Sequence, residues 1–191
     1  MISLSGSNRF TDIAGVVRAF QWRPEVKVAE IGAPQRLAPY ALAFEAEINQ
    51  SPDDSAFGRL VILYNPAGDN AWQGTTRFVS YTQADVEFEM ATDPLLADVA
   101  WSWLVDALHH TDAVQRAASG TVTTITSHAF GGLDEVPQSA EIEMRCSWTS
   151  AKEGDEAKHV AAWQELLCQL AGLEPLVDGI TSLRHHSQGS R

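Results

Sequence analysis

The sequence predicts an α+β fold in which helices pack on one face of a mainly antiparallel sheet of four to five strands. Three observations lead to this fold class. Apolar residues recur at helical spacing in four segments, β-favouring residues dominate between them, and residues 140–149 alternate between apolar and polar. Such alternation indicates a strand with one covered face and one wet face, which antiparallel sheets permit. The predicted order is α-β-α-β-β-α-β-β-α.

The first part of the chain is predicted to contain two helices around a short strand. Apolar residues recur every three or four positions from Phe10 to Phe20, and Pro24 disfavours a longer helix. Alternation over 25–31 predicts a short strand near an edge of the sheet. A second helix is expected over 37–49. Its apolar residues step by four, three and four positions: Leu37, Ala41, Phe44 and Ile48.

The central part is predicted to hold two antiparallel strands and a helix. The strands are 59–64 and 75–82, and the turn-rich residues 65–70 join them. Asp93-Pro94 indicates a helix start, because an Asp cap accepts a free backbone N–H and a following Pro loses no hydrogen bond. This helix is expected to end at His109. Because it is apolar around most of its circumference, we expect it to be the most buried helix, or to meet a partner with one flank.

Two strands and a final helix complete the predicted fold. The strands are 120–129, rich in β-branched residues, and 140–149. A charged linker over 152–158 precedes the last helix, and Gly172 ends it in a left-handed conformation. The residues of 140–149 that should face the helices are Ile142, Met144, Cys146 and Trp148.

Length and charge restrict the class of protein. The 191 residues suit one domain, predicted over 1–175, with a weakly ordered tail over 176–191. A net charge of -12 and a pI near 4.8 disfavour direct binding of nucleic acid, because that affinity comes mostly from Lys and Arg. No apolar run long enough for a membrane span and no export leader is recognisable, so we expect a cytoplasmic protein without membrane contact. Cys146 and Cys168 are isolated in sequence and are expected to be buried apolar residues.

Motifs of common enzymes and cofactor sites are missing from the sequence. It lacks GxxxxGK, GxGxxG, HExxH, GxSxG and CxxC, so we expect no cofactor and no metal, and enzymatic activity stays an open question. His109-His110 is the best local candidate for metal or proton chemistry. Adjacent helical residues point about 100° apart, however, and cations suit a helix C-terminus, which favours a structural role. His128 and His159 are also expected to be structural, and the pair His185-His186 offers no fixed geometry.

Five residues are candidates for binding a ligand or a partner: Trp72, Arg77, Trp101, Glu143 and Arg145. The two arginines lie in predicted strands, where Glu141 and Glu143 share the wet face. They form either a cross-strand charge ladder, the favoured interpretation, or a clamp for a small acidic ligand. Trp72 precedes a strand and either covers the core, which is favoured, or is exposed for recognition.

A set of local motifs extends over roughly residues 10 to 180. They are RPEV at 23–26, APQRLAPYA at 33–41, DPLLAD at 93–98, WSWL at 101–104, ASGTVT at 118–123, RCSWT at 145–149, LLC at 166–168 and AGL at 171–173. As a set they resemble an actinobacterial family catalogued as a domain of unknown function, number three thousand in its series. The resemblance implies a bacterial cytoplasmic protein and brings no activity, substrate or catalytic residue.

The leading functional prediction is a non-enzymatic binding or regulatory domain that acts through a protein partner or as a homo-oligomer. It rests on the missing catalytic motifs and on Trp101 and Trp103, which lie on the helix that is apolar nearly all round. The alternative is a small-molecule enzyme or ligand sensor with a pocket between sheet and helices. That pocket would use Arg77, Arg145 and a neighbouring glutamate such as Glu143.

Overall fold

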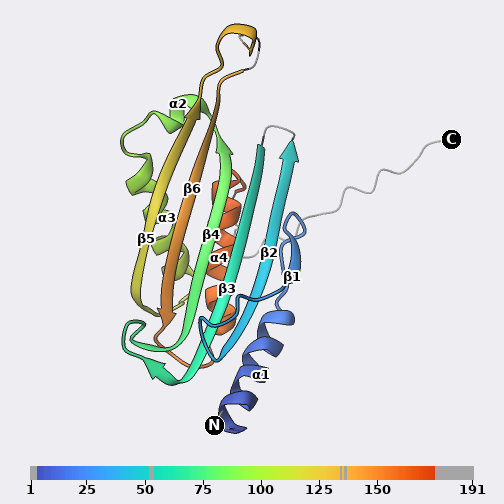
Figure 1. Cartoon of the computed structure of the whole chain (residues 1–191), viewed down its shortest axis with the longest axis vertical. Helices are drawn as coiled ribbons and strands as arrows, with labels where there is room; N and C mark the ends of the chain where they lie inside the picture. The colour runs from blue at the N-terminus through green and yellow to red at the C-terminus, as the bar shows by residue number, and fades with distance from the viewer. Residues whose placement is uncertain (1–3, 52–53, 134, 136, 175–191) are drawn as a thin grey trace, which may run out of the picture.

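A single six-stranded sheet forms the centre of the molecule (Figure 1). The computed structural model describes residues 4–51, 54–133, 135 and 137–174. The strand order is β1-β2-β3-β4-β6-β5, and every neighbouring pair is antiparallel. The fold is therefore α+β, as predicted, but with six strands instead of four to five. The strands are β1 Lys27–Ile31, β2 Tyr40–Ser51, β3 Asp54–Asp69, β4 Gly74–Val86, β5 Gln115–Ser127 and β6 Ser139–Ser150.

Helices cover one face of this sheet, and the opposite face is turned to the viewer in Figure 1. Helices α3 and α4 pack on each other behind the sheet, and α1 lies against α4 and β3. The α-helices of the described residues are α1 Leu4–Arg18, α2 Phe88–Ala91, α3 Leu96–His110 and α4 Glu156–Leu170. Among the described residues, no helix has the length and apolar character needed to cross a membrane.

The predicted helix over 37–49 is wrong, because β2 occupies this segment. Its residues pair with β1 on one side and with β3 on the other, from Tyr40 opposite Tyr64 to Asn49 opposite Ser55. The apolar residues of this segment fit steps of three and four positions, but they also fit the period of two that a strand requires. Alternate residues of β2 face the helices: Tyr40, Leu42, Phe44, Ala46 and Ile48.

Other predicted elements are present with different bounds. The helix expected from Asp93 begins at Leu96, since the Asp93 carboxylate accepts the N–H of Leu95 at 2.8 Å in a turn before the helix. The short helix α2 was not expected. Contrary to prediction, α3 is not the most buried helix, because α4 buries twice as many of its residues. The predicted tail lies outside the described residues.

The alternation in β6 is confirmed, and it defines the core. Ile142, Met144 and Trp148 have no solvent exposure and face the helices, as does Phe78 from β4, and Trp163 from α4 faces the sheet. These large side chains fill the space between the sheet and the helices. Gly172 has φ of +70°, and the N–H of Leu173 bonds the Cys168 carbonyl at 2.8 Å, so the last helix ends as predicted.

Candidate functional site

The sheet face opposite the helices, here called the open face, contains two of the predicted candidates. Arg145 Nε lies 3.0 Å from Glu143 Oε1, and the Arg145 guanidinium lies over the Tyr81 ring with its carbon 5.7 Å from the centroid. The Tyr81 hydroxyl donates to Glu143 at 2.9 Å, and burial together with this bond raises the pKa of Tyr81. The Gln83 side-chain amide donates to the Glu141 carboxylate. Glu143 therefore pairs with Arg145 of the same strand and Glu141 with the neutral Gln83, so the predicted cross-strand ladder of arginines and glutamates is not formed.

Arg77 lies apart from these side chains. Arg77 is opposite Thr149 and Tyr81 is opposite Arg145, so the two arginines are separated by four residue positions, about 13 Å along the strands. The Arg77 side chain crosses β6 and donates to the carbonyl oxygen of Ala117 in β5 at 2.8 Å. The predicted two-arginine clamp is therefore not formed by this structure.

The partners of Arg77 are neutral and belong to strands β5 and β6. Its Nη atoms lie 2.6 Å from Ser147 Oγ, 3.1 Å from Thr149 Oγ1 and 3.4 Å from Ser119 Oγ. Among the described residues, no carboxylate lies within 4 Å of this buried guanidinium. Burial lowers its pKa. Ala117 lies at an irregularity of β5 with φ of +49°, so Arg77 holds a strained bulge in place.

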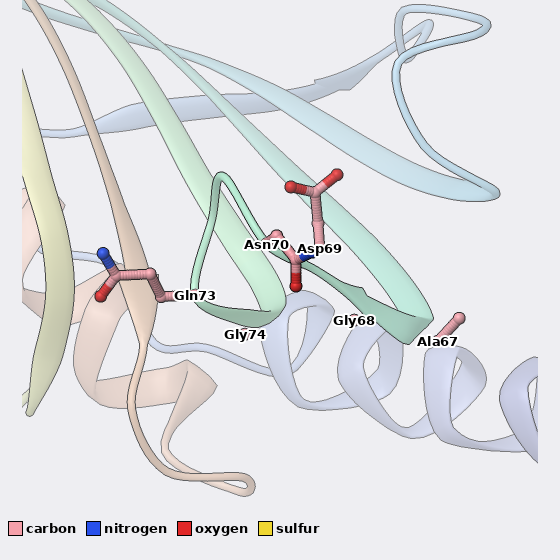
Figure 2. Close-up of a pocket in the computed structure, with 6 residues that line it drawn as sticks. All are labelled: Ala67, Gly68, Asp69, Asn70, Gln73 and Gly74. Atoms are coloured by element: carbon pink, nitrogen blue, oxygen red, sulfur yellow. The ribbon is translucent and has the colours of Figure 1, made fainter.

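Trp72 lies in the turn between β3 and β4. Other residues of this turn line an open hollow of about 750 Å³ (Figure 2). Asp69 accepts the N–H groups of Ala71 at 2.8 Å and of Trp72 at 3.1 Å, so its carboxylate is used to form the turn. Figure 2 shows Asp69 and Asn70 beside each other and Gln73 pointing away from them. The polar groups of this turn do not converge on one point, and Trp72 itself is half-buried.

Trp101 belongs to the covered side of the sheet. A Cβ atom at Gly120 of β5 would lie 2.9 Å from the Trp101 ring, so the indole packs directly on the strand backbone. Trp72, Trp101 and Arg145 therefore occupy three different places: a turn, the helix layer and the open face. The structure brings together only Glu143 and Arg145 of the five predicted candidates.

The strongest candidate for a binding site is an apolar surface that the sequence analysis did not define. Its five large side chains are between 42% and 61% exposed. They come from α2, from α3 and the residue before it, and from the connection between α3 and β5. We call this the α3 surface, and it consists of Met90, Leu95, Val99, Val105 and Val114.

Two hollows lie within the α3 surface, on opposite flanks of the helix. One, of about 180 Å³, is formed between α2 and α3 and is lined by Met90, Val99 and the half-buried Trp103. The other, of about 310 Å³, lies where α3 leads into β5 and is lined by Val105 and Val114. Exposed apolar surface with shaped hollows is typical of protein-binding sites.

Acidic side chains lie among the residues of the α3 surface, where helical spacing places Asp98 and Asp106 between Val99 and Val105, and no lysine or arginine occurs between Arg77 and Arg116. Within the part of the chain that the structure describes, none of the exposed carboxylates of this segment pairs with a lysine or arginine. The surface therefore combines exposed apolar side chains with negative charge that no lysine or arginine balances. The six exposed acidic residues are Glu87, Glu89, Asp93, Asp98, Asp106 and Asp112. This charge pattern was readable from the sequence and was missed there.

The buried titratable groups contribute to the core and not to a site. Trp148 Nε1 donates to His159 Nδ1 at 3.1 Å, and His159 Nε2 lies 3.0 Å from Ser150 Oγ, so both ring nitrogens are used. Burial raises the pKa of Cys146 to about 12 and of Cys168 to about 11, which keeps both thiols protonated and unreactive. Among the described residues, no group of His, Cys, Asp and Glu is arranged to hold a metal ion.

The other predicted histidines also have packing roles in the structure. His110 Nδ1 lies 3.0 Å from Glu165 Oε1, which links the end of α3 to α4. His128 lies just beyond β5, with its ring 5.1 Å from that of Phe88 in α2. The tail pair His185-His186 lies outside the described residues.

Comparison with known proteins gives one result. A family model described as "Protein of unknown function (DUF3000)" matches residues 6–181. The chain belongs to this family. No curated protein and no solved structure matches the chain. The family description carries no activity, so the functional inference has to come from the α3 surface and its surroundings.

Proposed function

We propose that the chain is a non-enzymatic binding domain that recognises a protein partner through the α3 surface. The observation that carries this proposal is the combination of five exposed apolar side chains with six exposed carboxylates in one segment. Apolar side chains of the partner supply affinity when they enter the hollows of this chain, and the carboxylates of this chain select a partner of positive charge. The expected partner surface carries apolar side chains for the hollows and Lys or Arg for the carboxylates.

The net charge of -12 supports a protein partner over nucleic acid, because no cationic stripe lies near the α3 surface to contact phosphates. A cytoplasmic location and an actinobacterial origin stay predictions. The alternative of a small-molecule enzyme or sensor also stays a prediction. Large buried side chains such as Trp148 and Trp163 fill the space where its pocket was expected.

Two valines of similar exposure allow a matched test. Val99 on the α3 surface is 42% exposed, and Val79 on the open face is 37% exposed. Tagged full chains carrying Val99→Asp or Val79→Asp are compared with the unmodified chain for recovery of stoichiometric partners from native lysate. We expect recovery to fall at least tenfold with Val99→Asp and to be unchanged with Val79→Asp. Equal recovery by all three chains would show that the α3 surface is not the binding site.

A further inference from the structure

The two edges of the sheet differ in how they are protected against pairing with another strand. β1, at one edge, has only five residues and carries the exposed charges of Lys27 and Glu30, and Glu30 bonds Arg18 at 2.7 Å. β5, at the other edge, has thirteen residues. Natural sheets usually protect an exposed edge with charges, proline, a bulge or a short strand. β1 uses two of these devices, a short length and charge.

Most of β5 uses none of them. The only irregularity lies between Arg116 and Ser119, at the start of the strand, where Arg77 holds the bulge. From Ser119 to Ser127 the pairing with β6 is regular, and the sequence SGTVTTITS contains no charge and no proline. All residues of this segment except Val122 are exposed. Every second residue of such an edge strand directs its N–H and C=O away from the sheet.

The Val105 flank of the α3 surface borders this free edge. Trp101 packs on the β5 backbone at Gly120, and Val105 follows Trp101 by one turn on the same side of α3. The larger hollow extends from Val105 to Gln115, the first residue of β5. A strand added to β5 would therefore place alternate side chains beside Trp101, and beside Val105 where it continues past Ser119 toward Gln115.

We infer that the partner adds an extended segment to β5 as a seventh strand of the sheet. This inference rests on the proposed function and names its mode of recognition. The added segment has apolar residues at alternate positions, facing α3, and Lys or Arg residues that reach Asp98 and Asp112. Backbone hydrogen bonds to β5 supply affinity without sequence preference, and the α3 surface selects the side chains.

A second copy of this chain is a poorer occupant of the edge. Pairing of two β5 strands would bring the α3 helices of both copies toward each other. Both helices carry exposed carboxylates and no lysine or arginine, so the approach is opposed by like charges. A cationic extended segment meets no such repulsion.

The test uses the full chain and a random dodecapeptide library. Peptides are selected on the unmodified chain, synthesised, and titrated against the unmodified chain and Val105→Asp. Amide hydrogen exchange of the chain is then followed by NMR with and without peptide. We expect selected peptides to contain Lys or Arg with apolar residues at every second position, and to lose binding at least tenfold on Val105→Asp. Bound peptide should slow exchange at least tenfold at alternate residues from Ser119 to Ser127.

The outcomes separate the two proposals. Peptides that depend on Val105 but leave exchange in β5 unchanged would overturn strand addition and leave the α3 surface as the binding site. Failure to select any peptide, or equal binding to Val105→Asp, would overturn both. A concentration-dependent dimer with the same alternate protection in β5 would identify a second copy as the occupant and overturn the inference of a cationic partner.

Proline substitutions provide an independent check of the edge. Thr123 and Thr124 are neighbours, so only one of them directs its N–H away from β6. Proline at that position should leave the melting temperature near that of the unmodified chain and abolish peptide binding. Proline at the other position should lower the melting temperature. Undiminished peptide binding by the variant that retains stability would contradict strand addition.

Discussion

At the residue scale, His159 shows how burial fixes a protonation state. Trp148 donates to Nδ1, so the ring proton is on Nε2, which donates to Ser150. Ser150 in turn donates to the Lys152 carbonyl at 2.7 Å. Burial lowers the pKa of His159 to about 4, because the charged ring would have no water around it. The core therefore contains a neutral histidine.

This protonation state makes stability depend on pH. The unfolded chain binds a proton at His159 near pH 6.5 and the folded chain only near pH 4, so stability is retained above pH 6.5 and falls between these values. The difference corresponds to roughly 3 kcal/mol of unfolding free energy. Urea unfolding of the protein and of His159→Gln, from pH 7 to pH 4, measures it. The variant should lose less stability over this range, and parallel profiles would contradict the assignment.

Arg77 is the second residue whose environment carries a prediction. Arg77→Met removes all four hydrogen bonds to β5 and β6, including the one that holds the Ala117 carbonyl. We expect the free energy of unfolding to fall by roughly 1.5–3 kcal/mol, because bonds to a charged donor are lost. Arg145→Met is the control: Arg145 is exposed, and its ion pair is expected to contribute less than about 1 kcal/mol. Equal losses in urea unfolding would show that Arg77 does not stabilise the bulge.

At the element scale, the contact between β3 and α4 depends on a glycine. A Cβ atom at Gly58 would lie 2.7 Å from Trp163 Cζ2 and 3.2 Å from Leu167 Cδ1. Gly58→Ala should therefore push α4 away from the sheet and reduce stability by about 1–3 kcal/mol. Gly15→Ala in α1 is the opposite case, since no atom lies within 4 Å and alanine favours the helix by about 0.5–1 kcal/mol. Melting temperatures that move in the same direction for both variants would contradict this packing.

Elements whose apolar residues fit only one spacing, that of a helix or that of a strand, were predictable from the sequence. Elements whose apolar residues fit both spacings were not. β6 alternates without exception, so its inward face of Ile142, Met144 and Trp148 was identified correctly. In 37–49, alanine and glutamate favour a helix, and the apolar residues fit both periods. Pairing with β1 and β3 decides that case, and those contacts are not local in sequence.

The candidate site was harder to predict from the sequence than the fold. Sequence alone indicated that the helix around Trp101 is apolar nearly all round, but not which residues stay exposed once α4 and the sheet cover it. That packing leaves Val99 and Val105 exposed to solvent. Arg77 was predicted to bind a ligand or partner. In the structure it bonds the bulge at the start of β5.

At the scale of the whole molecule, negative charge and apolar exposure coincide at the α3 surface. A chain of net charge -12 attracts cationic partners over distances comparable to the Debye length, about 10 Å at 0.1 M salt. We expect association with the partner to slow at least several-fold between 50 and 500 mM salt, with a smaller change in dissociation. Stopped-flow kinetics measures both rates. Association that is insensitive to salt would contradict recognition by charge.

Hydroxyl-radical footprinting of the full chain, free and bound to its recovered partner, tests the central claim most directly. It compares the exposure of individual side chains on both faces of the molecule. We expect Leu95, Val99 and Val105 to become protected, while Phe57 and Tyr81 on the open face keep their reactivity. Protection of Phe57 and Tyr81 with unchanged reactivity on α3 would place the binding site on the open face and contradict the proposal.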